Sequence, residues 1–116
     1  MLSAEELHAR GVAAINGGRV RAARRPLEQA LSRASDDATL GAIEASLAFV
    51  EAETGNRDAA MRLCETALAR SGLSDETRGS LLSQHGVLVL FSGRTAEATK
   101  ELDAAIERLS DYPTLL

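Results

Sequence analysis

The sequence predicts an all-α fold, an array of three helical hairpins in a chain of 116 residues. Three observations support this prediction. Aromatic residues make up only 3% of the chain, so the core must be built from Ala, Leu, Val and Ile, and Ala and Leu are strong helix formers. There are only two prolines, which leaves long stretches without a helix breaker. Finally, a pattern of small residues repeats along the chain, as in stacked helical units.

The repeat is marked by a glycine between the two helices of each unit. Gly18, Gly55 and Gly93 are separated by 37 and 38 residues. The predicted units are 3–35, 37–72 and 75–110, and residues 111–116 match the beginning of the second unit, which predicts a truncated fourth unit and a longer parent protein. The other positions that keep this step are Gly11, Ala48 and Gly86; Ala23, Ala60 and Ala98; Leu27, Cys64 and Leu102; Ala30, Ala67 and Ala105; and Leu31, Leu68 and Ile106.

Local signals define the helices of the first unit. Ser3 and Glu6 have the spacing of a capping box, and the helix that they open is predicted to run to Asn16, before Gly17-Gly18. The second helix is predicted from Val20 to Ala34, and Pro26 is expected to bend it or to delay its start.

The second unit should begin after Ser35-Asp36-Asp37, break at Gly55-Asn56 and continue from Asp58 to Arg70. In the third unit, Ser74 is expected to cap a helix that reaches Ser92, and Thr95 the next one. The helix from 75 to 92 is apolar around most of its circumference. We therefore expect neighbouring helices to bury it on all sides.

Composition and charge argue against several classes of function. A net charge of -4 disfavours nucleic acid as a partner. The N-terminus is acidic where a signal peptide would be basic, and no apolar run is long enough to cross a bilayer, so we expect a cytoplasmic protein that does not bind membranes. With one cysteine and no cluster of metal-ligand spacing, neither a metal nor a cofactor is expected.

The repeated small residues resemble the tetratricopeptide repeat. Gly11, Ala48 and Gly86 stand at the first-helix signature of that family, and Ala23-x-x-x-Leu27 is one of three matches to its second-helix signature. The aromatic residues of the signature are missing, and the period exceeds the family's 34 residues. The resemblance implies an α-solenoid in which the first helix of each unit lines a concave groove.

A second resemblance concerns short segments at 7–14, 93–98 and 102–106. They are similar to the N-terminal repeats of actinobacterial proteins that carry a C-terminal CHAT domain, a caspase-like protease module. This resemblance implies that the chain is the regulatory or substrate-recruiting arm of a larger bacterial protease, whose His/Cys pair lies elsewhere. The repeat region of a large bacterial transcriptional regulator is an alternative.

The candidates for catalysis are weak, and we predict no catalytic residue. Cys64 could be a nucleophile with His8 or His85 as its base, but its position in the repeat predicts a small buried hydrophobe. His85 is expected to be a satisfied core histidine. Glu51 and Glu53 are two residues apart on a helix, so their side chains should point apart. The basic residues Arg19, Arg21, Arg24, Arg25 and Arg33 are expected to face solvent.

The best functional candidate is the concave face, which we expect to bind a peptide or helix of a protein partner. A partner, another domain of the same full-length protein, or a second copy could fill it. Self-assembly through the C-terminal helix, with Leu102, Ala105, Ile106 and Leu109, is a further alternative. The predicted face consists of Glu5, His8, Val12 and Ile15, then Ala45, Phe49 and Ala52, and then Ser83, Val87 and Leu90.

Overall fold

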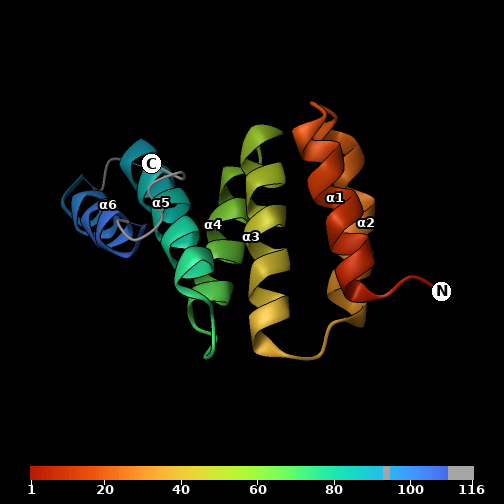
Figure 1. The fold of residues 1–116 in the computed structure, drawn as a ribbon. Helices are drawn as coiled ribbons and strands as arrows, with labels where there is room; N and C mark the ends of the chain where they lie inside the picture. The colour runs from red at the N-terminus through yellow and green to blue at the C-terminus, as the bar shows by residue number, and fades with distance from the viewer. Residues whose placement is uncertain (93–94, 110–116) are drawn as a thin grey trace.

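A computed structural model describes residues 1–92 and 95–109, except for the side chains of 95–99 and 109. Within these residues all regular secondary structure is α-helical (Figure 1). The prediction of an all-α protein is confirmed. The predicted start of a fourth unit at 111–116 lies outside the described residues. The six helices are α1 (Ala4–Asn16), α2 (Val20–Arg33), α3 (Asp37–Glu53), α4 (Arg57–Leu68), α5 (Asp75–Phe91) and α6 (Thr95–Leu109).

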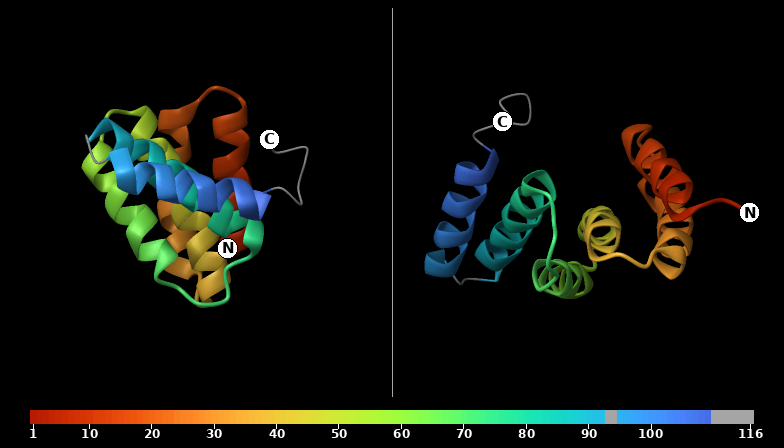
Figure 2. Two further views of the ribbon diagram at one scale, coloured as in Figure 1. Left: turned by 90° about the vertical axis from the view of Figure 1, so that its left-hand side faces the viewer. Right: turned by 60° about the horizontal axis from the view of Figure 1, so that its bottom comes forward.

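The helices pack most extensively in consecutive pairs, α1 with α2, α3 with α4, and α5 with α6. The pairs follow one another from α1 and α2 at one end to α5 and α6 at the other (Figures 1 and 2), in a molecule of 45 × 29 × 26 Å. Helix α3 also contacts both α1 and α5. The first helices of the three pairs are therefore neighbours, which places the predicted face on adjacent helices.

Two of the turns inside the pairs have the same hydrogen-bonded geometry. Gly18 has a φ of 77°, and the N–H of Arg19 donates to the carbonyl of Ala14 at 2.8 Å. Gly55 has a φ of 91°, and the N–H of Asn56 donates to the carbonyl five residues before it, also at 2.8 Å. Both are Schellman motifs, which need a residue in the left-handed region and so favour glycine. The predicted turns at these two glycines are confirmed, and Gly93 lies outside the described residues.

Side chains cap three of the helices at their N-termini. The Ser3 hydroxyl accepts from the N–H of Glu6, whose carboxylate accepts from the N–H of Ser3, each at 3.1 Å, which confirms the capping box. Asp36 caps α3 by accepting from the N–H of Thr39, and Ser74 caps α5 as predicted. Helix α4 ends at Leu68, two residues before the predicted end.

Pro26 lies inside α2, which begins at Val20 and continues to Arg33. The alternative that Pro26 delays the start of this helix is wrong. A proline at this position removes the hydrogen bond to the carbonyl of Ala22, four residues earlier. Ala22 is exposed, so water can bond to that carbonyl and the helix continues through the proline.

The repeated small residues form the contact between paired helices. The second helices of the first two pairs use Ala23 and Ala60, both fully buried, and Leu27 and Cys64 are fully buried one turn later. On the facing helix, a Cβ added to Gly11 would lie 2.5 Å from Cγ of Leu27. Only glycine fits at that position, because the neighbouring core is close-packed.

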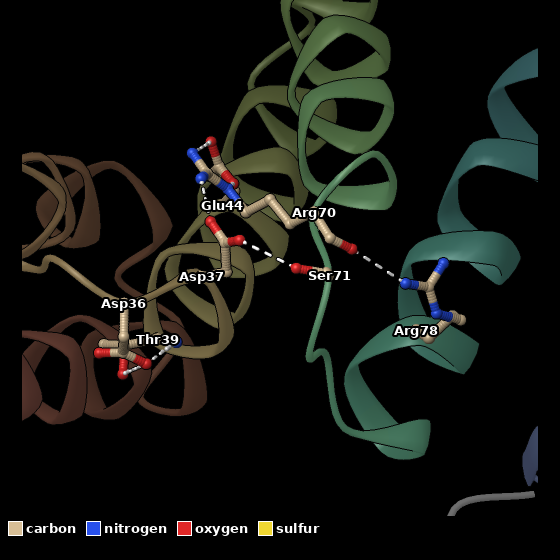
Figure 3. Close-up of polar contacts among 7 residues, drawn as sticks. All are labelled: Asp36, Asp37, Thr39, Glu44, Arg70, Ser71 and Arg78. Atoms are coloured by element: carbon tan, nitrogen blue, oxygen red, sulfur yellow. Dashed lines mark hydrogen bonds and ion pairs between the residues drawn. The ribbon is translucent and has the colours of Figure 1, made fainter.

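Polar contacts hold α3, α4 and α5 together at the end of the molecule where α3 begins (Figure 3). Arg70, just after α4, donates to both oxygens of Glu44 at 2.6 and 3.1 Å and to Asp37 at 3.0 Å. The hydroxyl of Ser71 also donates to Asp37. Arg78 of α5 donates to the carbonyls of Leu68 and Arg70. Arg70 therefore links the end of α4 to α3, and Arg78 links it to α5.

Helix α5 is not buried on all sides, contrary to the prediction. Leu81 and Val89 are fully buried, but Val87, Leu90 and Phe91 are 41%, 46% and 65% exposed. The packing of α5 explains this difference, because α3, α4 and α6 cover only part of its circumference. An apolar stripe at the C-terminal half of α5 is left facing solvent.

Candidate functional site

Two side-chain hydrogen bonds link the first helices of the three pairs. Nε2 of His8 on α1 lies 2.9 Å from the Ser46 hydroxyl on α3, and Nε2 of Gln84 on α5 donates to the carbonyl of Ala45 on α3 at 3.1 Å. Burial lowers the pKa of His8, since the charged imidazolium is poorly solvated there. These bonds fix α1 and α5 on either side of α3, where two depressions form.

The first depression lies among α1, α3 and α5 and has a volume of about 350 Å³. Its walls are mostly small or apolar, and Gln84 and Asn16 supply amide groups. The lining residues are Val12, Ile15, Asn16, Ala45, Ser46, Phe49, Ser80 and Gln84.

The second depression, of about 300 Å³, lies between α3 and α5 and reaches the first residue of α4. Phe49 and Gln84 line both depressions, which are therefore contiguous, and we call the two together the inner groove. The residues around the second depression are Phe49, Ala52, Glu53, Arg57, Ser83, Gln84, Val87, Leu88 and Phe91.

Seven of the ten residues predicted for the concave face line the inner groove. His8 does not line it but bonds to Ser46, which does. Glu5 and Leu90 are exposed and belong to neither depression. The seven are Val12, Ile15, Ala45, Phe49, Ala52, Ser83 and Val87.

The prediction missed Arg57, which lines the second depression, because it considered only the first helix of each unit. Arg57 begins α4, yet the tight turn at Gly55-Asn56 leaves it beside the end of α3. Its guanidinium carbon lies 4.7 Å from the ring centroid of Phe91, a cation–π contact worth about 0.5–1 kcal/mol at an exposed site. The proximity of Arg57 to the glycine turn is the sequence signal that could have indicated this position.

His85 is buried and uses both ring nitrogens. Nδ1 is hydrogen-bonded to the carboxylate of Glu101 on α6, and Nε2 lies 3.1 Å from the carboxylate of Glu65 on α4. The structure agrees with the prediction of a satisfied core histidine. The contribution of His85 is to connect α5 with the helices on both sides of it.

Cys64 is fully buried on the contact side of α4. Burial, and then the nearby carboxylates of Glu101 and Glu65, raise the pKa of its thiol to about 12. Because the thiolate is the nucleophilic form, a thiol with so high a pKa is unreactive near neutral pH. Its environment is that of a small core side chain.

The prediction that the basic residues at and within α2 face solvent holds for four of the five arginines. Arg19, Arg21, Arg25 and Arg33 are exposed. Arg24 instead forms an ion pair with Glu51 of α3 at 2.7 Å and donates to the Thr54 hydroxyl at 3.0 Å. Glu51 is thereby engaged between helices, and Glu53 is exposed in the groove, so the two carboxylates do not form a pair.

Within residues 1–92 and 95–109, no group of three or more His, Cys, Asp or Glu side chains is placed to hold a metal ion. No helix in the same part of the chain is both long and apolar enough to cross a membrane. The chain matches no model of a known protein family, and a search of curated proteins finds no relative.

Proposed function

We propose that the chain is a protein-interaction module whose helix pairs stack as in tetratricopeptide proteins, and that it binds an amphipathic helix or extended apolar segment in the inner groove. The repeat of 37 and 38 residues, the pairwise packing of consecutive helices and the contacts of α3 with α1 and α5 support the stacked arrangement. In such arrays each unit contacts only its neighbours, and the first helices share one surface.

The observation that carries this proposal is the group of exposed apolar side chains at the second depression. Phe49, Val87 and Phe91 come from two helices and surround one hollow, although each is 37% exposed or more. Contiguous exposed apolar surface is typical of interaction sites. Burying one aliphatic side chain of a partner there would contribute about 1.5–3 kcal/mol.

The groove is also held in place before any partner binds. The His8–Ser46 and Gln84–Ala45 bonds fix the helices that form its walls. A surface that is already ordered loses little conformational entropy on binding, so more of the contact energy remains as affinity.

The context that we favour follows from the resemblance to CHAT-associated repeats. In a bacterial, cytoplasmic protease of that kind, the groove would recruit a substrate or receive a regulatory segment. Another domain of the same parent protein, or a parent that regulates transcription, would use the same surface.

Self-assembly through α6 is the second candidate, and one observation favours it. Ile106 is 59% exposed, although Ala105 beside it is buried. Leu109, which the sequence also predicted for self-assembly, lies outside the described side chains. Sedimentation at several protein concentrations tests this candidate: a single monomeric species throughout contradicts it, and association that Ile106→Glu abolishes supports it.

The main proposal can be tested with a displayed library of random 16-residue peptides selected on the immobilised protein. Phe49→Asp places a charge among the apolar groups and should weaken the binding of selected peptides about 30-fold or more. The matched control is Ala22→Asp, on the exposed side of the first turn of α2, where an acidic residue suits the helix. Circular dichroism checks that both variants stay helical. Equal binding by folded Phe49→Asp and Ala22→Asp would contradict the proposal.

A further inference from the structure

The inner groove has charged residues at one end only. Glu53 and Arg57 line the second depression, and every other residue of the groove is uncharged. Within the part of the chain that the structure describes, neither side chain forms an ion pair. The second depression therefore ends beside one cation and one anion that have no ionic partner among the described residues.

The two charges differ in how they are held. The guanidinium of Arg57 lies against the ring of Phe91, which itself lines the second depression. A guanidinium in contact with an aromatic ring keeps the N–H groups at its edge available, and their planar arrangement matches the two oxygens of a carboxylate. Glu53 is exposed and makes no such contact, so its side chain can turn toward water.

We propose that the segment bound in the inner groove carries an aspartate or glutamate side chain next to its apolar residues, and that this carboxylate pairs with Arg57. The inference rests on the function proposed above and identifies the chemistry of the partner, an acidic amphipathic segment of another protein. Its apolar side chains would contact Phe49 and Val87, while the carboxylate completes the hydrogen bonding of Arg57.

The two charged residues should then have opposite effects on affinity. Removing the charge of Arg57 removes an attraction to the partner carboxylate, whereas removing the charge of Glu53 removes a repulsion. This difference in sign separates recognition of an acidic segment from apolar contact alone, for which both substitutions would have similar small effects.

The experiment uses the same peptide library, with both peptide ends fused to other polypeptide so that only side chains can supply a carboxylate. Selected sequences are then synthesised with acetylated and amidated ends, and their binding is measured by calorimetry. The protein variants are Arg57→Gln, Arg57→Glu and Glu53→Gln. Arg62→Gln is the matched control, because Arg62 is exposed on the same helix but does not line the inner groove.

Peptides that depend on Phe49 should contain an acidic residue. Arg57→Gln should weaken the binding of these peptides about 3- to 10-fold, and Arg57→Glu should weaken it more. Glu53→Gln should strengthen their binding, and Arg62→Gln should change it less than about 2-fold. Replacing the peptide's acidic residue by its amide should weaken binding to the unmodified protein but not to Arg57→Gln, which is the signature of a direct pair.

Four results would overturn the inference. If Phe49-dependent peptides respond to Arg57→Gln no more than to Arg62→Gln, the partner is not recognised through a carboxylate, although the proposed function stands. If the selected peptides are basic and depend on Glu53, the charge has the opposite sign. If the protein dimerises and Phe49→Asp abolishes the dimer, a second copy fills the groove. If no peptide depends on Phe49, the proposed function fails as well.

Discussion

Arg70 forms a two-point ion pair with Glu44, in which Nε lies 2.6 Å from Oε1 and Nη2 lies 3.1 Å from Oε2. Glu44 is buried on α3, and Arg70 follows the last turn of α4. Hydrogen bonds to the carboxylates of Glu44 and Asp37 raise the pKa of Arg70, so its charged form is favoured. The bridge anchors the segment between α4 and α5, and with it the position of α5 beside the groove (Figure 3).

Replacing Arg70 with Met should destabilise the protein by about 2–4 kcal/mol, because Glu44 would stay buried without a cation. Urea unfolding measures the change. Arg62→Met, at an exposed position, is the control, and its free energy of unfolding should stay within about 0.5 kcal/mol of that of the unmodified protein. Adding Glu44→Leu to Arg70→Met should recover part of the loss. If the double variant loses as much stability as Arg70→Met and Glu44→Leu lose in total when each is measured alone, the pair does not act as a unit.

Gly11 and Gly41 provide a second prediction, in which similar substitutions should have different effects. Gly11→Ala would bring a Cβ within 2.5 Å of Cγ of Leu27, which is fully buried and cannot move aside. We expect a loss of about 1–3 kcal/mol from overpacking, despite the higher helix propensity of alanine. Thermal and urea unfolding would report it.

Gly41→Ala is the comparison for that experiment. Its Cβ would come within 2.2 Å of one methyl carbon of Leu73, but Cγ of Leu73 is 3.6 Å away and the side chain is only half-buried. The methyl group can rotate away, so the change in stability should be less than about 1 kcal/mol, with the propensity gain offsetting the contact. Equal effects of the two substitutions would show that the α1–α2 contact is not close-packed.

The small residues of the repeat and the glycine turns show which parts of the fold could be predicted from the sequence. The repeat aligned Gly11 with other small residues, and Ala23 and Ala60 are fully buried at matching positions. Burial at such positions follows from helical periodicity, and the turns at Gly18 and Gly55 follow from local backbone preference. Helical periodicity and turn preference both depend on residues close together in the chain, so a single sequence is enough to detect them.

Features that depend on how helices from different pairs meet could not be predicted. The bond between Arg70 and Glu44 joins residues 26 positions apart, and the repeat does not indicate it. The exposed apolar stripe of α5 could not be predicted either, because it too depends on how helices from different pairs meet. A helix that is apolar on every side gives no sign of which side its neighbours leave open, and Val87 and Phe91 are exposed only because of where α3, α4 and α6 pack. The placement of Arg57 in the groove likewise depends on the angle between α3 and α4.

Cys64 should react slowly with iodoacetamide in the folded protein. With a pKa of about 12, its thiolate fraction at pH 8 is about a thousandfold lower than that of an ordinary cysteine, and the side chain is fully buried. Mass spectrometry can follow alkylation at pH 8 with and without denaturing urea. A rate in the folded protein within about tenfold of the rate in urea would contradict the packing described for Cys64.

His8 predicts how stability depends on pH. Burial lowers its pKa in the folded protein below the value of 6.5 expected for the unfolded chain. Below pH 6.5 the unfolded state therefore binds more protons than the folded state, so the free energy of unfolding should fall as the pH decreases through this value. At higher pH His8 is neutral in both states and makes no pH-dependent contribution.

The His8 effect can be isolated by comparing the parent protein with His8→Gln, which cannot be protonated. Urea unfolding at pH 7.5, 6.5 and 5.5 should show that the unmodified protein loses stability relative to His8→Gln as the pH falls. Contributions of the other titrating groups are shared by both proteins and cancel in the difference. Parallel pH profiles would contradict the burial of His8. If the difference appears, peptide binding should weaken at the same pH, because His8 bonds to Ser46 in the wall of the groove.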